Sequence, residues 1–124
     1  MNMALSENHH DIRDAVRALC AQFPDTYHRD IDARRAYPEA FVQALTRAGW
    51  LAAMIPQEYG GAGLGLVEAS VVMEEINRCG GNAGACHGQM YNMGTLLRHG
   101  SKAQKEKFLP RIASGEWRLQ SMAV

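Results

Sequence analysis

The stretch HGSKAQKEKFLPRIASGEW, residues 99–117, carries start and stop signals for one α-helix. Gln104 follows Ser101 by three residues, the spacing of a capping box in which each side chain bonds the other residue's backbone N–H. Pro110 lies late in the segment, where it should loosen the last turn, and Gly115 suits a left-handed helix end. Apolar residues recur between these signals at helical spacing: Phe108, Leu109 and Ile112. We therefore predict a helix from Ser101 to Gly115.

The chain upstream shows the same period in further segments, bounded by residues that start or stop helices. Ser6 is a good N-cap, Pro24 stops the first segment, Pro38 opens the second and Asn82 is an N-cap of the fourth. The predicted helices cover residues 6–23, 38–48, 66–78 and 82–99. Residues 25–36 are mostly polar and are predicted to be a connector. The predicted fold is all-α, with five to six helices.

The chain downstream, EWRLQSMAV (residues 116–124), has a different pattern. Trp117 and Leu119 alternate with Arg118 and Gln120, as in a β-strand. A single strand cannot satisfy its own backbone hydrogen bonds. We therefore expect residues 1–115 to form a helical domain and residues 116–124 to be a strand that pairs with a part of the protein beyond this chain.

Composition excludes several classes of protein. The chain has 124 residues, enough for one core, and 13 basic residues balance 13 acidic ones. No basic stripe suggests a nucleic-acid partner, and no apolar run approaches the roughly 20 residues of a membrane span. The N-terminus resembles neither a secretory signal nor a mitochondrial transit peptide, and the three cysteines do not suggest disulfides. These features predict a cytoplasmic location.

The segment MIPQEYGGAGLGL, residues 54–66, places glycines at positions 60, 61, 63 and 65. It matches neither G-x-G-x-x-G nor a phosphate-binding P-loop. One interpretation is a loop that requires positive φ angles, and the other is a loop that closely approaches a ligand or a partner subunit. The pattern favours the structural interpretation.

The predicted helix 82–99 has two distinct faces. One face carries Cys86, Met90, Met93 and Leu97, and the opposite face carries Gly84, Gly88, Tyr91 and Thr95. Interior glycines cost about 1 kcal/mol each relative to alanine, so they should serve a purpose. They could admit a closely packed helix, or they could shape a ligand cavity with His87 and Tyr91 at its edge.

No catalytic or metal-binding cluster is evident. The spacing of Cys79, Cys86 and His87 is not that of a zinc site, and the adjacent Cys86 and His87 point to different helix faces. Glu74 and Glu75 are predicted to lie at a solvent-facing helix edge and to diverge. We predict no catalytic residue and no metal ligand in this chain.

Three stretches together resemble the N-terminal domain of acyl-CoA dehydrogenases. They are GWLAAMIPQEYGGAGLGL (49–66), VMEEINRCGG (72–81) and HGSKAQKEKFLPRIASGEW (99–117). The third is the most specific, because it is close to the family pattern GSEEQKEKYLPRLASGE. The resemblance covers nearly the whole chain. It implies a helical domain (residues 1–115), a β-barrel domain whose first strand would be residues 116–124, and a four-helix domain, usually assembled as tetramers.

The resemblance also implies a reaction. Such enzymes bind FAD and oxidise the Cα–Cβ bond of an acyl-CoA thioester, with a glutamate base that would lie beyond Val124. Electrons usually pass to an electron-transferring flavoprotein. The resemblance places Met122, Ala123 and Val124 beside the flavin, and Gly84, His87, Gly88 and Tyr91 on the wall of the acyl pocket. The chain alone is expected to be inactive.

Two alternatives remain open from the sequence. Acyl-CoA oxidases, nitroalkane oxidases and flavin-dependent two-component monooxygenases share this N-terminal domain, so the chemistry could differ. A helical interaction module without catalysis is the alternative from another class, although the predicted unpaired strand at residues 116–124 speaks against it.

Overall fold

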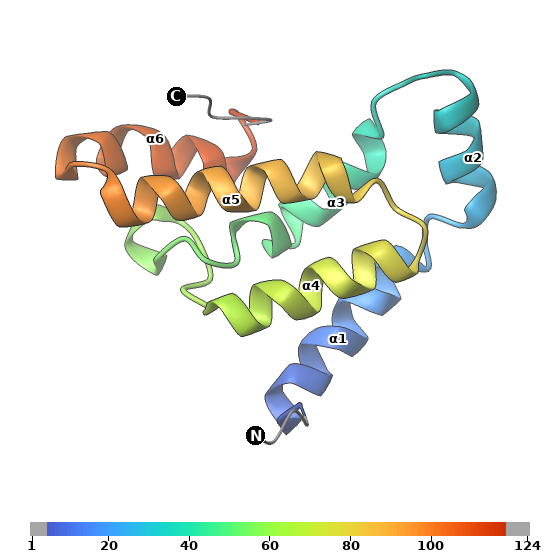
Figure 1. Cartoon of the computed structure of the whole chain (residues 1–124), viewed down its shortest axis with the longest axis horizontal. Helices are drawn as coiled ribbons and strands as arrows, with labels where there is room; N and C mark the ends of the chain where they lie inside the picture. Colours follow the sequence, from blue (N-terminus) through green and yellow to red (C-terminus); the bar gives the residue numbers. More distant parts are fainter. Residues whose placement is uncertain (1–4, 119–124) are drawn as a thin grey trace.

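The computed structural model describes residues 5–118, and all its regular elements in this range are helical (Figure 1). The six α-helices and two 3₁₀-helices are α1 (Glu7–Cys20), α2 (Asp25–Ala33), α3 (Glu39–Arg47), η1 (Trp50–Ala52), η2 (Gln57–Tyr59), α4 (Leu66–Arg78), α5 (Ala83–His99) and α6 (Lys102–Ser114). The all-α prediction is confirmed, and each of the five predicted helices is present.

The predicted capping box at the start of α6 is formed. The Ser101 N–H donates to Gln104 Oε1 at 2.8 Å, and the Gln104 N–H donates to Ser101 Oγ at 3.2 Å. The helix continues past Pro110 to Ser114, and Gly115 then adopts a φ of 80°. These local signals fix where α6 lies in the chain.

The predicted connector at residues 25–36 is wrong, because most of it forms α2. No residue of α2 is fully buried, and this nine-residue helix has few apolar side chains, chiefly Tyr27 and Ile31, so its apolar stripe is short. Polar contacts within the segment support it: Arg34 pairs with Asp30 at 2.7 Å and Arg29 with Asp25 at 3.7 Å, both four residues apart.

Helix α5 runs through the centre of the domain, with α4 on one side and α6 on another (Figure 1). Its N-terminal half joins a core shared with α1, α3 and α4, which includes Ile12, Val16, Phe41, Leu45, Val72, Ile76, Cys86 and Met90. Its C-terminal half joins a second core with α6 and the chain around η1, which comprises Ala52, Ile55, Met93, Leu96, Leu109 and Ile112. The two cores hold α5 in place, so its remaining surface is presented in a fixed orientation.

The prediction that Glu75 faces solvent is wrong. Its side chain is 2% exposed and accepts two hydrogen bonds from Arg17 of α1, at 2.8 and 3.1 Å. Arg13 and Arg78 lie within 3.7 and 3.8 Å of the same carboxylate. The Arg17 guanidinium lowers the pKa of the Glu75 carboxyl below its usual value. Glu74, by contrast, is exposed as predicted.

The predicted strand at residues 116–124 lies mostly outside the described residues, which end at Arg118. The described part of it, residues 116–118, is not a strand. Arg118 instead donates to Glu39 of α3 at 2.8 and 2.9 Å and lies over the ring of Tyr37. The proposed division into residues 1–115 and 116–124 stays a prediction.

Candidate functional site

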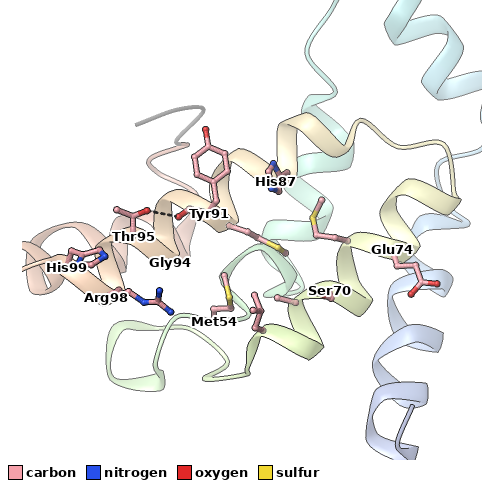
Figure 2. Close-up of a pocket in the computed structure, with 13 residues that line it drawn as sticks. Met54, Ser70, Glu74, His87, Tyr91, Gly94, Thr95, Arg98 and His99 are labelled. Carbon is pink, nitrogen blue, oxygen red and sulfur yellow. Dashed lines mark hydrogen bonds between the residues drawn. The ribbon is translucent and has the colours of Figure 1, made fainter. Parts of the chain in front are cut away.

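A groove of about 730 Å³ lies between α4, α5 and the chain at Met54 (Figure 2). Its volume falls in the range of small-molecule sites, roughly 300–1,000 Å³. The residues that line it are Met54, Leu66, Ala69, Ser70, Met73, Glu74, His87, Met90, Tyr91, Gly94, Thr95, Arg98 and His99. Most of its surface is apolar, with polar groups from α5 along one edge.

The glycine-rich loop fixes one border of the groove. Gly63 donates its N–H to Ile55 O at 2.8 Å, and Leu64 donates to Ala53 O at the same distance. A Cβ at Gly61 would lie 2.0 Å from Ile55 O, and Gly60 and Gly63 have positive φ angles. Because these amides bond the loop itself, they are not available to a ligand phosphate. The structure supports the structural interpretation of these glycines.

Two of the four residues predicted to line an acyl pocket lie in the groove. His87 and Tyr91 are one turn apart on α5, with their ring centroids 5.1 Å apart, and Tyr91 is 41% exposed. Gly84 is exposed but outside the lining, and Gly88 is buried, with its carbonyl accepting from Asn92 Nδ2 at 2.7 Å. The structure therefore brings His87 and Tyr91 together at the groove and leaves the two glycines beside it.

Gly94 is a groove residue that the sequence did not single out. A Cβ built at Gly94 meets nothing within 4 Å, so a side chain there would extend into open space. Gly94 lies between the two helix faces that the periodicity defines, so no pattern distinguished it. The absent side chain widens the groove midway along α5.

The contribution of α4 also differs from the sequence pattern. Leu66, Ala69, Met73 and Ile76 recur at helical spacing; Ala69 and Ile76 are buried, but Leu66 is 74% exposed and Met73 is half-buried. Leu66, Ala69 and Met73 line the groove together. Their apolar spacing signals a buried stripe in the sequence, yet in the structure part of that stripe faces the groove.

The two ends of the groove carry opposite charges. Glu74 lies at the end formed by α4, whereas Arg98 and His99 lie in the last turn of α5 (Figure 2). Arg98 forms no ion pair with any residue between positions 5 and 118. No pattern in the sequence selects Arg98, because its place in the groove depends on how α4 and α5 pack.

The described residues offer little for covalent or metal chemistry. Burial raises the pKa of Cys86 to about 12, and burial together with a hydrogen bond to Cys79 raises that of Cys20 to about 12. Thiols with such values are poor nucleophiles at neutral pH. Residues 5–118 contain no group of three side chains placed to hold a metal ion, and none of their helices is long and apolar enough to cross a membrane.

The family model for the N-terminal domain of acyl-CoA dehydrogenases matches residues 6–116. The chain belongs to the acyl-CoA dehydrogenase family. It is 36% identical over 117 residues to a mitochondrial isovaleryl-CoA dehydrogenase of Pongo abelii, a match that covers 91% of this chain and 28% of the relative. It is 35% identical over 112 residues to a probable acyl-CoA dehydrogenase, fadE25, of Mycobacterium leprae, covering 89% and 28%.

Solved structures of acyl-CoA dehydrogenases share the fold. The structure of a glutaryl-coenzyme A dehydrogenase in complex with glutaryl-CoA matches with a TM-score of 0.82 at 27% identity, over 96% of this chain and 31% of that one. This chain therefore spans less than a third of the length of these relatives. Met122, Ala123 and Val124, the predicted flavin contacts, lie outside the described residues.

Proposed function

We propose that this chain is the N-terminal part of a flavin-dependent acyl-CoA dehydrogenase. The whole enzyme would oxidise the Cα–Cβ bond of an acyl-CoA thioester, and bound FAD would accept the hydride. The observation that carries the proposal is the sequence similarity to enzymes named acyl-CoA dehydrogenases along nearly the whole chain. Electron-transferring flavoprotein as acceptor, a tetrameric assembly and a cytoplasmic location belong to the same proposal.

Within that enzyme, we propose that α5 contributes a wall of the acyl pocket. The exposed His87 and Tyr91 lie side by side on α5 at the border of the groove, and the methionines opposite them are adaptable apolar contacts. Gly84 and Gly88 lie next to this pair in α5, and because they have no side chains they leave the helix backbone uncovered at these positions. An acyl chain would pack against these residues and lose water, while the His87 and Tyr91 side chains supply a polar edge.

We propose that residues 5–118 do not hold flavin by themselves. The backbone N–H groups of residues 60–64 in the glycine-rich loop donate to carbonyl groups of residues 52–57, so they are not free to bind a phosphate. The predicted flavin contacts lie outside the described range. We therefore expect that the 124-residue chain does not retain FAD. Flavin absorbance after incubation with FAD and desalting tests this directly, and retention of one flavin per chain would contradict it.

The reaction itself is tested on the full-length product of the gene. We expect it to convert acyl-CoA to the α,β-unsaturated thioester with an electron acceptor other than oxygen. Stoichiometric hydrogen peroxide would instead assign the chain to an oxidase of the same fold. Absence of any unsaturated product from a series of acyl-CoAs, in a flavin-loaded protein, would refute the dehydrogenase proposal.

The wall formed by α5 is tested by His87→Leu in the same protein. We expect the ratio of kcat/KM between branched and straight acyl-CoAs to change about tenfold, because one or two methylene groups in an apolar pocket have effects of this size. His10→Leu is the matched control, since His10 is exposed on α1 and does not line the groove. An unchanged ratio in His87→Leu would remove α5 from the pocket.

A further inference from the structure

Helices α1 and α4 lie side by side and run in the same general direction (Figure 1). Two polar contacts show how they are aligned. His9 Nε2 lies 2.9 Å from Glu68 Oε1, and Arg17 donates to Glu75 at 2.8 and 3.1 Å. The partners are 59 residues apart in the first contact and 58 residues apart in the second. This nearly constant offset means that the two helices pack in a single register.

The same register brings two cysteines together. Cys20 is the last residue of α1, and Cys79 directly follows α4. Cys79 follows Cys20 by 59 residues, so the two lie opposite each other, one turn beyond the contact between α1 and α4 at Glu75. Both side chains pack in the core that α1 and α4 share, and the two thiols are hydrogen-bonded. The sequence does not suggest this pair, because only the packing of α1 on α4 brings the two cysteines together.

The two thiols differ in their exposure to solvent. Cys20 is 2% exposed, whereas Cys79 is half-buried and donates to Ile76 O at 3.1 Å. Cys86, the third cysteine of this core, is 0% exposed and lies on α5, outside the register of α1 and α4. Both members of the pair are at helix ends, and Gly80 follows with a φ of 82°, so small backbone shifts there leave the helix interiors intact. A small oxidant can therefore reach Cys79, with Cys20 protected beside it.

We propose that hydrogen peroxide converts Cys20 and Cys79 to a reversible disulfide that joins α1 to α4. In the first step the Cys79 sulfur attacks one peroxide oxygen, the O–O bond breaks, and the products are Cys79 sulfenic acid and water. In the second step the Cys20 sulfur attacks the sulfenic sulfur, the S–S bond forms, and the Cys20 proton leaves with the hydroxyl group as a second water. Overall, two thiols are oxidised to one disulfide, and one peroxide is reduced to two molecules of water.

The contact between the two sulfurs decides what becomes of the sulfenic acid. Burial raises the pKa of Cys20 to about 12, so little of this thiol is ionised at neutral pH. The attack is intramolecular, however, and groups held in contact react as if at a very high concentration. The disulfide should therefore form before a second peroxide oxidises Cys79 to the irreversible sulfinic acid. Because α4 also lines the groove, oxidation would tie one wall of the groove to α1.

Peptide mapping of the full-length protein tests the proposal. The folded protein is treated with hydrogen peroxide, its remaining thiols are alkylated in denaturant, and it is digested with trypsin. Trypsin leaves Cys20 in the peptide of residues 18–29, and both Cys79 and Cys86 in the peptide of residues 79–98. We expect these two peptides to be joined, with a mass lower by two hydrogen atoms than their sum and with the alkyl group on Cys86. Dithiothreitol should separate them.

Two variants show whether the register determines the pairing. Cys20→Ala should abolish the joined peptide and leave Cys79 as the sulfinic acid. Cys86→Ala is the matched control, because it removes a buried cysteine of the same core and should preserve the joined peptide; if it does not fold, the position of the alkyl group in the wild type still decides the pairing. A disulfide that contains Cys86, a bond between two chains on a non-reducing gel, or peroxide-treated protein with Cys20 and Cys79 still unlinked would overturn the proposal.

Discussion

The buried carboxylate of Glu75 allows a specific prediction about stability. Glu75→Gln keeps the size of the side chain but replaces two charged hydrogen bonds from Arg17 with weaker ones. Hydrogen bonds to charged groups contribute about 1.5–3 kcal/mol each, and the freed arginine can reach water because its side chain is 45% exposed. We expect the free energy of unfolding at pH 7 to fall by about 2–3 kcal/mol.

The reverse variant, Arg17→Met, should destabilise the chain more than Glu75→Gln does. It leaves the Glu75 carboxylate buried, with only Arg13 and Arg78 at 3.7 and 3.8 Å. An uncompensated buried charge is more costly than a solvated one. Arg34→Met is the matched control: it breaks an exposed pair with Asp30 and should change stability by no more than about 0.5 kcal/mol.

The pH dependence follows from the lowered pKa of Glu75. A carboxyl with a lower pKa when folded stabilises the protein above its unfolded pKa, about 4.3, and this contribution disappears as the pH falls through the folded value. The gap between the wild type and Glu75→Gln should therefore close in acid. Urea unfolding followed by circular dichroism from pH 7 to pH 3 measures it. A constant gap, or a smaller loss in Arg17→Met than in Glu75→Gln, would refute the reasoning.

Three further predictions concern two glycines, the N-cap of α6, and the ion pair between Arg118 and Glu39. Gly94→Ala should raise the free energy of unfolding by about 0.5–1 kcal/mol, because alanine has the higher helix propensity and its Cβ would meet no other atom. Gly61→Ala should lower the free energy of unfolding by roughly 3 kcal/mol, because its Cβ would overlap the backbone at Ile55. Urea titrations of both variants check the two signs. Ser101→Ala should cost about 1 kcal/mol through loss of the α6 cap, measured in the same way. The pair between Arg118 and Glu39 lowers the pKa of Glu39, and NMR titration should show this shift shrinking in high salt.

Much of the fold was predictable because its signals are local. Caps such as Ser101 and Asn82 and stop signals such as Gly115 act within one turn, so the sequence alone placed five helices. Helix α2 was missed because its apolar stripe is short: Tyr27 packs against the core, but most of the helix is polar. The burial of Glu75 was missed because its main partner, Arg17, lies 58 residues away on another helix.

The candidate site was only partly predictable for the same reason. Spacing on one helix singled out His87 and Tyr91, which do line the groove. It did not single out Gly94 or Arg98, since their place in the groove depends on how α4, α5 and the loop at Met54 pack together. The family resemblance suggested the proposed reaction class, but it could not predict this packing.

The most direct test of the account is a structure of the full-length protein with an acyl-CoA bound. We predict that the acyl group contacts His87 or Tyr91 of α5 within about 4.5 Å, the range of apolar contact. An acyl group bound elsewhere, with both of these side chains facing solvent or another protein segment, would contradict it.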